Sequence, residues 1–212
     1  MPPVPPSAPA ETSPSGRFVT PRAWAEAQLG AAAELLLEQA HLEKKAAAAA
    51  MQFLFRLPVQ VPIGLHRELS ALAREELVHF ERTLRLLGQR GLAYGPQPPS
   101  DYAGKLKAAL ATTMPERLVD ELLASAVIED RSHERLLLLA EVFAATDAPL
   151  ADFYADLAAA ESRHGPTYVE VAAAVLPADV VVARHARLRA HEAAVLHALP
   201  FAHRLHSGWP ES

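Results

Sequence analysis

Glu76-Leu-Val-His79 and Glu161-Ser-Arg-His164 are two copies of one short pattern, a glutamate followed three residues later by a histidine. On a helix, this spacing places the carboxylate and the imidazole one turn apart on the same face. One such motif is common by chance and indicates little. Two copies in one chain indicate a repeated structural unit that presents the same pair of side chains twice.

A lone glutamate precedes each copy at nearly the same distance. Glu43 lies 33 residues before Glu76, and Glu129 lies 32 residues before Glu161. A helix with one glutamate followed by a helix with Glu-x-x-His, present twice, is the ligand arrangement of a two-metal centre inside a four-helix bundle. The matched spacing therefore predicts that six side chains bind two metal ions: Glu43, Glu76, His79, Glu129, Glu161 and His164.

The rest of the chain predicts the helices that this arrangement requires. Segments rich in Ala, Leu and Glu, without period-two alternation, predict long helices and no strands. These helices are expected over residues 20–55, 65–89, 115–145, 150–175 and 178–199, with a short one over 102–111. The long connection over 92–114 lets the second and third long helices run in the same direction. We expect an all-α four-helix bundle with a long crossover between its second and third helices and an extra C-terminal helix.

Length and composition favour a single domain. The chain has 212 residues, of which half are hydrophobic and only 9 are glycine. Residues 1–16 are rich in proline and predict a disordered tail, residues 17–200 predict the metal-binding domain, and residues 201–212 predict a short polar tail. The absence of cysteine excludes disulfides, iron–sulfur ligation and thiolate zinc sites. No signal peptide or membrane span is evident, so we expect a cytoplasmic protein.

The four glutamates interrupt the apolar stripes of their helices. Leu36, Ala40 and Ala47 share the helix face of Glu43, and Leu69 and Leu72 share that of Glu76. Four carboxylates gathered in a helical core would be costly, because each loses hydration and they repel one another. Two divalent cations would remove both costs. The alternative is that one or two of these glutamates form ordinary surface salt bridges.

Three nearby carboxylates do not fit the ligand spacing. Glu38 and Glu134 each lie five residues from a predicted ligand, which is about 140° around a helix. We expect them on the surface or beside the ligands. Glu75 is adjacent to Glu76 and is expected to point elsewhere.

Carboxylate and imidazole ligands without sulfur favour iron or manganese, and zinc also binds such sites. Six protein ligands on two ions leave open positions that a small molecule can reach. With iron, that molecule is most naturally dioxygen, and the protein would then place a substrate C–H bond beside the activated oxygen.

Longer blocks around these residues resemble one known family, the tRNA 2-methylthio-N6-isopentenyladenosine hydroxylases. The blocks are Glu38-Gln-Ala-His-Leu-Glu43, Arg74-Glu-Glu-Leu-Val-His79-Phe, Ile128-Glu129-Asp-Arg131 and Asp152-Phe-Tyr-Ala-Asp-Leu-Ala-Ala-Ala-Glu161-Ser-Arg-His164. The resemblance implies a ferritin-like fold and an oxygen-dependent, non-haem di-iron monooxygenase whose two irons are held by the six predicted ligands. It implies hydroxylation of the isopentenyl group of a modified adenosine in the tRNA anticodon loop. Two electrons would come from a separate, unidentified electron-transfer partner.

The sequence leaves several alternatives open. A ferritin-like iron-storage or peroxide-scavenging protein would have the same six ligands but would form a hollow shell, whereas a hydroxylase would be a monomer or small oligomer. A helical interaction module would bind no metal. The run over residues 46–50 predicts either an apolar channel to the metals or close helix packing. The candidate phosphate contacts are four basic clusters: Lys44 with Lys45, Arg82 with Arg85 and Arg90, Lys105 with Lys107, and Arg184 with Arg187 and Arg189. The formal net charge of −5 does not exclude a polyanionic partner.

Overall fold

A computed structural model describes residues 19–210 of the chain, so the tail predicted over residues 1–16 lies outside the described part. The described residues form seven helices and no strand, which confirms the all-α prediction. In chain order the helices are α1 (Arg22–Glu26), α2 (Ala32–Leu54), α3 (Ile63–Gln89), α4 (Asp101–Lys107), α5 (Glu116–Phe143), α6 (Ala148–Ala173) and α7 (Ala178–Ala198).

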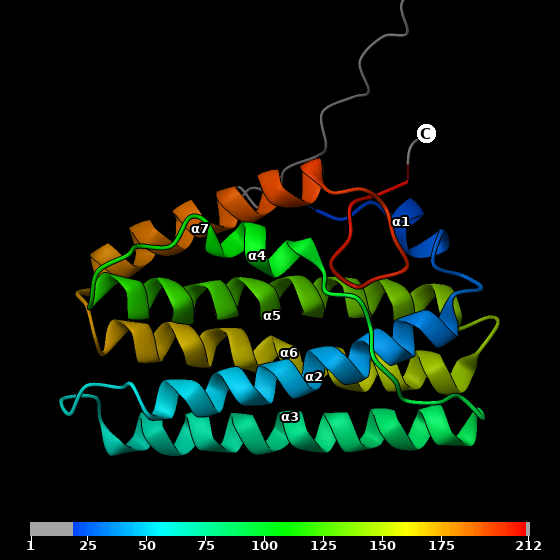
Figure 1. The fold of residues 1–212 in the computed structure, drawn as a ribbon, viewed down its shortest axis with the longest axis horizontal. Helices are drawn as coiled ribbons and strands as arrows, with labels where there is room; N and C mark the ends of the chain where they lie inside the picture. The colour runs from blue at the N-terminus through cyan, green and yellow to red at the C-terminus, as the bar shows by residue number, and fades with distance from the viewer. Residues whose placement is uncertain (1–18, 211–212) are drawn as a thin grey trace, which may run out of the picture.

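The four long helices α2, α3, α5 and α6 form two antiparallel pairs. Helix α2 packs against α3 and α5 against α6, and α3 also contacts α6 (Figure 1). Helices α3 and α5 run in the same direction, because the connection after α3 crosses the length of the bundle through α4 before α5 begins (Figure 1). Helices α4 and α7 lie side by side over α5.

The first predicted helix is interrupted, so the expectation of one continuous helix from residue 20 to residue 55 was wrong. Helix α1 ends at Glu26 and α2 begins at Ala32, with Gly30 at a φ of 94° between them. Glycine adopts this backbone conformation without the steric cost that a side chain would add. The turn lets α1 bury Trp24, whose ring lies 4.3 Å from the Arg135 guanidinium and whose indole N–H donates to Ser207 Oγ at 3.1 Å.

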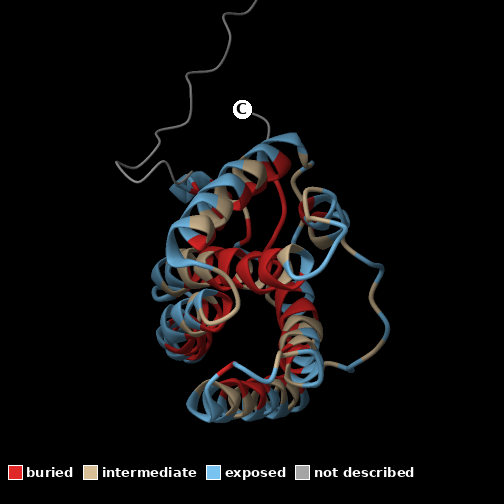
Figure 2. Ribbon diagram, turned by 90° about the vertical axis from the view of Figure 1, so that its left-hand side faces the viewer, coloured by how far each residue is buried: buried red, intermediate tan, exposed pale blue. Residues whose placement is uncertain are grey.

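The buried apolar side chains form two main clusters, one toward each end of the bundle. One cluster includes Leu36, Leu136 and Leu157, and the other includes Leu72 and Leu122. On each long helix the predicted metal-binding residues fall between the segments that contribute to the two clusters. Figure 2 shows the buried faces of the helices turned toward the middle of the bundle. The fold therefore places a polar layer between two apolar halves.

The segment after α7 folds back onto the bundle rather than extending away from it. Leu205, His206 and Ser207 are buried, and the Leu205 N–H donates to Glu38 Oε2. The backbone N–H of Gly208 donates to the Pro200 carbonyl at 3.0 Å, which closes the segment into a loop. Among the residues 19–210, no helix has the length and apolar character needed to cross a membrane.

Candidate metal centre

The structure brings together all six residues that the sequence singled out. Helix α2 contributes Glu43, α3 contributes Glu76 and His79, α5 contributes Glu129, and α6 contributes Glu161 and His164. Every one of these side chains is buried.

The six residues form two overlapping groups that share Glu76 and Glu161. The first group adds Glu43 and His79 to these two carboxylates, and the second adds Glu129 and His164. Within each group, one possible ligand atom per residue lies within 4.8 Å of the others. Two metal ions, one held by each group, would fit this arrangement. The role of the six residues as ligands stays a prediction.

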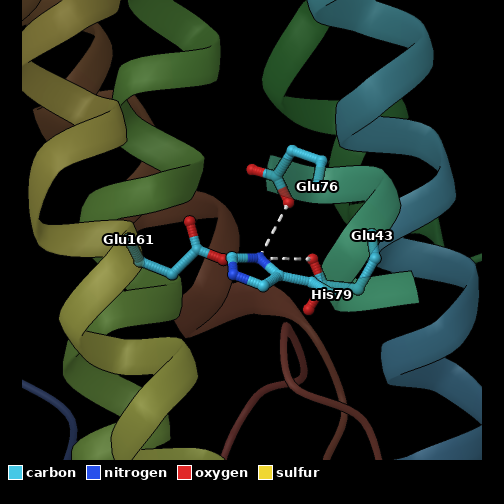
Figure 3. Close-up of side chains that lie close together, drawn as sticks. All are labelled: Glu43, Glu76, His79 and Glu161. Carbon is cyan, nitrogen blue, oxygen red and sulfur yellow. Dashed lines mark ion pairs between the residues drawn. The ribbon is translucent and has the colours of Figure 1, made fainter. Parts of the chain in front are cut away.

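In the first group, the His79 ring points into the centre of the bundle (Figure 3). Its Nδ1 atom lies 3.5 Å from Glu76 Oε2 and 3.8 Å from Glu43 Oε2. Glu161 reaches the same place from α6, on the opposite pair of helices (Figure 3). The turn-by-turn spacing on α3 and the packing of α3 against α6 therefore produce this convergence.

In the second group, the His164 ring has the same orientation. Its Nδ1 atom lies 2.8 Å from Glu76 Oε1 and 3.2 Å from Glu161 Oε2. Both histidines thus turn Nδ1 toward the carboxylates, which leaves Nε2 for partners outside the cluster.

The electrostatics of the cluster favour additional positive charge. Burial raises the pKa of Glu43 well above its ordinary value, and the charges of Glu76 and Glu161 raise it further. Burial and the charges of Glu161 and Glu76 do the same to the pKa of Glu129. For His164, burial lowers the pKa, but the adjacent carboxylates of Glu161 and Glu76 outweigh burial and bring it to about 10. Without metal, the cluster therefore binds protons.

Several buried polar atoms of the cluster have no hydrogen-bond partner among the described residues. They are Nδ1 of His79 and both oxygens of Glu76, of which Oε1 lies 2.8 Å from His164 Nδ1 without the geometry of a hydrogen bond. Leaving buried polar atoms unpaired is costly, and a cation coordinated by them would remove that cost. The chemistry of these oxygen and nitrogen donors thus fits two divalent metal ions.

Glu75 lies outside the cluster, in a different direction from Glu76, but it contacts one of the clustered histidines. Its Oε2 atom lies 3.1 Å from His164 Nε2, on the side of the ring away from the cluster, while Arg163 donates to its Oε1 atom at 2.5 Å. A histidine that binds metal through Nδ1 carries its proton on Nε2, and a carboxylate that accepts this proton fixes the ring orientation. Gln39 similarly donates to Glu43 Oε1 at 2.7 Å. No spacing rule in the sequence indicates either partner.

A pocket of about 360 Å³ reaches the cluster from the surface between α2, α4 and α5. Glu43, Glu129 and Glu161 line its inner end. More of the pocket's surface is apolar than polar, and its apolar lining residues include Leu42, Ala46, Ala49 and Ile128. The size lies within the range of about 300–1,000 Å³ that is typical of small-ligand sites.

The alanine run on α2 contributes both to the pocket and to close helix packing, the two alternatives that the sequence left open. Ala46, Ala48 and Ala49 line the pocket, whereas Ala47 and Ala50 are buried in the helix packing. Successive residues of one helix face different directions, so one run of small side chains can do both.

Comparisons with known proteins give the family. The family model described as tRNA-(MS[2]IO[6]A)-hydroxylase (MiaE) matches residues 13–207. The chain belongs to this family. A tRNA 2-(methylsulfanyl)-N(6)-isopentenyladenosine(37) hydroxylase from Pseudomonas putida is 37% identical over 153 residues, which are 72% of each chain. The hydroxylase of the same name from Salmonella typhimurium is 34% identical over 109 residues, 51% of this chain and 39% of that protein. The resemblance to the tRNA hydroxylase family predicted from the sequence is therefore confirmed.

A solved structure extends the comparison beyond the hydroxylase family. Protein 43 with aldehyde deformylating oxygenase activity from Synechococcus superimposes with a TM-score of 0.82 and 36% identity, over 91% of this chain and 96% of that one. This likeness implies the ferritin-like fold that the sequence led us to expect.

Proposed function

We propose that this protein hydroxylates the isopentenyl group of 2-methylthio-N6-isopentenyladenosine in tRNA. The observation that carries the proposal is the buried carboxylate and imidazole cluster at the inner end of an apolar pocket, in a chain of the tRNA hydroxylase family. The cluster offers metal ligands, the pocket offers space for an apolar side chain, and the family supplies the substrate.

In this proposal the six clustered residues hold two iron ions, with Glu76 and Glu161 shared between them. Bound iron supplies the activation of dioxygen, which is chemistry that side chains alone do not provide. Glu75 keeps the His164 ring in the orientation that presents Nδ1 to the metal. The six clustered residues support the proposal that this four-helix bundle is a ferritin-like di-iron protein.

The pocket binds and orients the isopentenyl group. Leu42, Ala46 and Ile128 present apolar surface beside Glu43 and Glu129, so the prenyl group lies next to the metals and excludes water from them. An anticodon-loop base is already single-stranded, so turning it toward the protein costs less than extruding it from a duplex. In this proposal the substrate is tRNA, and the protein acts on it in the cytoplasm.

The two electrons that hydroxylation consumes come from another protein. With no cysteine, the chain has no ligands for an iron–sulfur or rubredoxin-type centre of its own. A separate electron-transfer partner is therefore part of the proposal.

The test is a direct assay of the product. Iron-loaded protein is incubated with prenylated tRNA, dioxygen and a chemical or enzymatic reducing system, and the nucleosides are analysed by mass spectrometry. We expect one added oxygen on the prenylated nucleoside, and none with the Glu129→Gln protein. No product from wild-type protein that carries about two irons per chain would overturn the proposal.

A second candidate is removal of the formyl carbon from an aldehyde, which the likeness to the Synechococcus oxygenase favours. The apolar pocket would admit an aliphatic chain as readily as a prenyl group. The same iron-loaded preparation is offered an aliphatic aldehyde, and the loss of one carbon is measured. The proposed hydroxylase predicts turnover of tRNA and little turnover of the aldehyde.

Uptake of many irons per chain would instead favour iron storage.

A further inference from the structure

The lysines of this chain are confined to two helices. The chain has four lysines among its 20 basic residues: Lys44, Lys45, Lys105 and Lys107. The first two are on α2 and the other two are on α4, and all four side chains are exposed. Both helices contribute residues to the lining of the pocket that reaches the carboxylate cluster.

The lysines differ from most arginines in having free charges. None of the four forms an ion pair with a carboxylate among residues 19–210, although Lys44 Nζ donates to the Tyr94 hydroxyl at 2.7 Å. By contrast, Arg82 pairs with Asp156 at 2.8 Å and Arg90 pairs with Asp147 at 2.6 Å. An arginine already neutralised by a carboxylate attracts a phosphate less than a free ammonium does.

Two arginines of the α7 cluster that the sequence offered are paired with a carboxylate, and the third, Arg189, does not line the pocket. Arg184 and Arg187 both contact the buried carboxylate of Asp120, at 2.8 and 2.9 Å. They join α7 to α5 and are used within the fold. The clusters on α2 and α4 are the ones that retain their charge beside the pocket.

Two of the lysines line the pocket itself, one from each helix. Lys45 projects from α2 and Lys107 from α4, and both are exposed, whereas the glutamates that line the pocket at the cluster are buried. Positive charge therefore lies at the entrance and the metal-binding groups at the inner end. This charge distribution fits a ligand whose apolar group enters the pocket while its anionic groups stay outside.

Helix α4 is held rigidly enough to serve as one edge of the entrance. Ser100 caps its first turn by accepting from the Tyr102 N–H at 3.2 Å. The Tyr102 ring is buried, stacks on His206 with 4.5 Å between ring centroids, and donates its hydroxyl to Glu192 at 3.1 Å. Lys107 thus projects from a fixed helix rather than from a loose loop.

We propose that Lys45 and Lys107 bind the RNA phosphates on either side of the nucleotide whose side chain enters the pocket. This inference rests on the proposed function and specifies the surface that meets the anticodon loop. Single-stranded RNA is bound through positive charge that tracks its backbone, and each neutralised phosphate adds to the salt dependence of binding. Lys44 and Lys105 widen the same basic edge.

The first test measures RNA binding as a function of salt. The ligand is a fluorescently labelled anticodon stem-loop that contains the prenylated adenosine. The double variant Lys45→Gln/Lys107→Gln is compared with Arg67→Gln/Arg85→Gln, which removes two exposed charges from α3. We expect the slope of log K against log salt to become shallower by about 1.4 in the lysine variant, since each single-strand phosphate contact contributes about 0.7. The arginine variant should keep the wild-type slope.

The second measurement separates this inference from the proposed function. With tRNA as substrate, the lysine variant should raise KM and leave kcat unchanged, because the lysines lie away from the reacting group. If wild-type protein hydroxylates tRNA and both double variants bind RNA with the wild-type slope, the inference is wrong and the function stands. If the wild type does not hydroxylate tRNA, the binding comparison still decides the inference. Equal loss of slope in both double variants, or no RNA binding by the wild type, would also overturn it.

Discussion

His164 lies between two sets of carboxylates that act on it in different ways. Its Nδ1 atom faces Glu76 and Glu161 inside the bundle, and its Nε2 atom faces Glu75 at 3.1 Å on the outside. The inner pair supplies charge where a metal would lie. With metal bound at Nδ1, the outer carboxylate would accept the proton on Nε2 and so fix the orientation of the ring.

Removing this outer carboxylate should weaken metal binding without removing a ligand. We expect Glu75→Ala to lower iron affinity about 10- to 100-fold, the usual cost of losing such a partner. Glu75→Gln should lose less, because its amide oxygen can still accept from Nε2. Affinity is measured by competition with a chelator, with Glu81→Ala as the control, since Glu81 is an exposed carboxylate on the same helix. Wild-type affinity in Glu75→Ala would show that Glu75 does not orient the ring.

Glu38 shows what burial does to a carboxyl group outside the cluster. Burial raises its pKa from 4.5 to about 7, although the backbone hydrogen bond from Leu205 and nearby positive charges oppose the shift. The unfolded chain loses this proton near pH 4.5 and the folded protein only near pH 7. Between these values the folded state binds more protons, so this group makes the protein less stable as the pH rises.

Replacing Glu38 by glutamine should therefore flatten part of the pH dependence of stability. Between pH 4.5 and pH 8, the free energy of unfolding of Glu38→Gln should rise relative to that of the wild type by on the order of 3 kcal/mol. Its amide oxygen can still accept the Leu205 N–H, which retains the contact to the C-terminal segment. Urea unfolding of metal-free protein at both pH values measures the difference. A constant difference between the two proteins across this range would contradict the pKa shift.

At the scale of elements, most helix limits could be predicted because prolines and glycines mark them. Pro62, Pro115, Pro149 and Pro177 all lie at or beside helix starts. The break at Gly30 was missed because the apolar pattern of the sequence continues through it. The reason for the break is tertiary, since it allows Trp24 to be buried. The C-terminal segment was read as a polar tail because its buried contacts are to residues far away in the sequence.

One glycine in that segment lies where no side chain fits. A Cβ atom at Gly208 would lie 1.8 Å from the Leu199 carbonyl oxygen. We expect Gly208→Ala to destabilise the protein by about 1–3 kcal/mol, the usual cost of overpacking, and to release the segment from the bundle. Trypsin should then cleave faster after Arg204, which this segment contains.

Gly104 on α4 provides the matched control. No atom lies within 4 Å of a Cβ built there, and alanine is the better helix former. Gly104→Ala should keep the wild-type cleavage rate and equal or exceed wild-type stability. Equal cleavage of the Gly208→Ala and wild-type proteins would show that the segment tolerates a side chain at this position.

At the scale of the whole molecule, the six clustered residues could be predicted because their spacing repeats. Two Glu-x-x-His motifs and two glutamates at matched distances require only helices and a bundle in order to meet. The pocket could not be predicted in the same way, since its walls combine α2 with α4 and with His206 from the C-terminal segment. Glu75 was missed for a related reason, because its partner His164 lies 89 residues away in the sequence.

The carboxylate layer between the two apolar halves affects the stability of the whole bundle. Four glutamates and two histidines are buried there, and the pKa values of Glu43 and Glu129 are raised by burial and by their neighbours' charges. Without metal, this layer should oppose folding. With metal, the same residues should stabilise the folded state through binding.

This reversal predicts that one substitution will have opposite effects in the two states. In metal-free protein near pH 8, Glu129→Gln removes a buried carboxyl group that folds only by taking up a proton or by staying charged beside its neighbours, so it should raise the melting temperature. At saturating metal the same variant has lost a ligand, so its melting temperature should fall below that of the wild type. At metal concentrations of about 100 Kd, wild-type protein gains about 2.7 kcal/mol per site, and the variant should gain less. Calorimetry with and without Fe²⁺ or Mn²⁺ measures both differences, with Glu170→Gln, an exposed residue on α6, expected to show neither. A shift of the same sign in both states would mean that Glu129 is an ordinary buried carboxyl group and not a metal ligand.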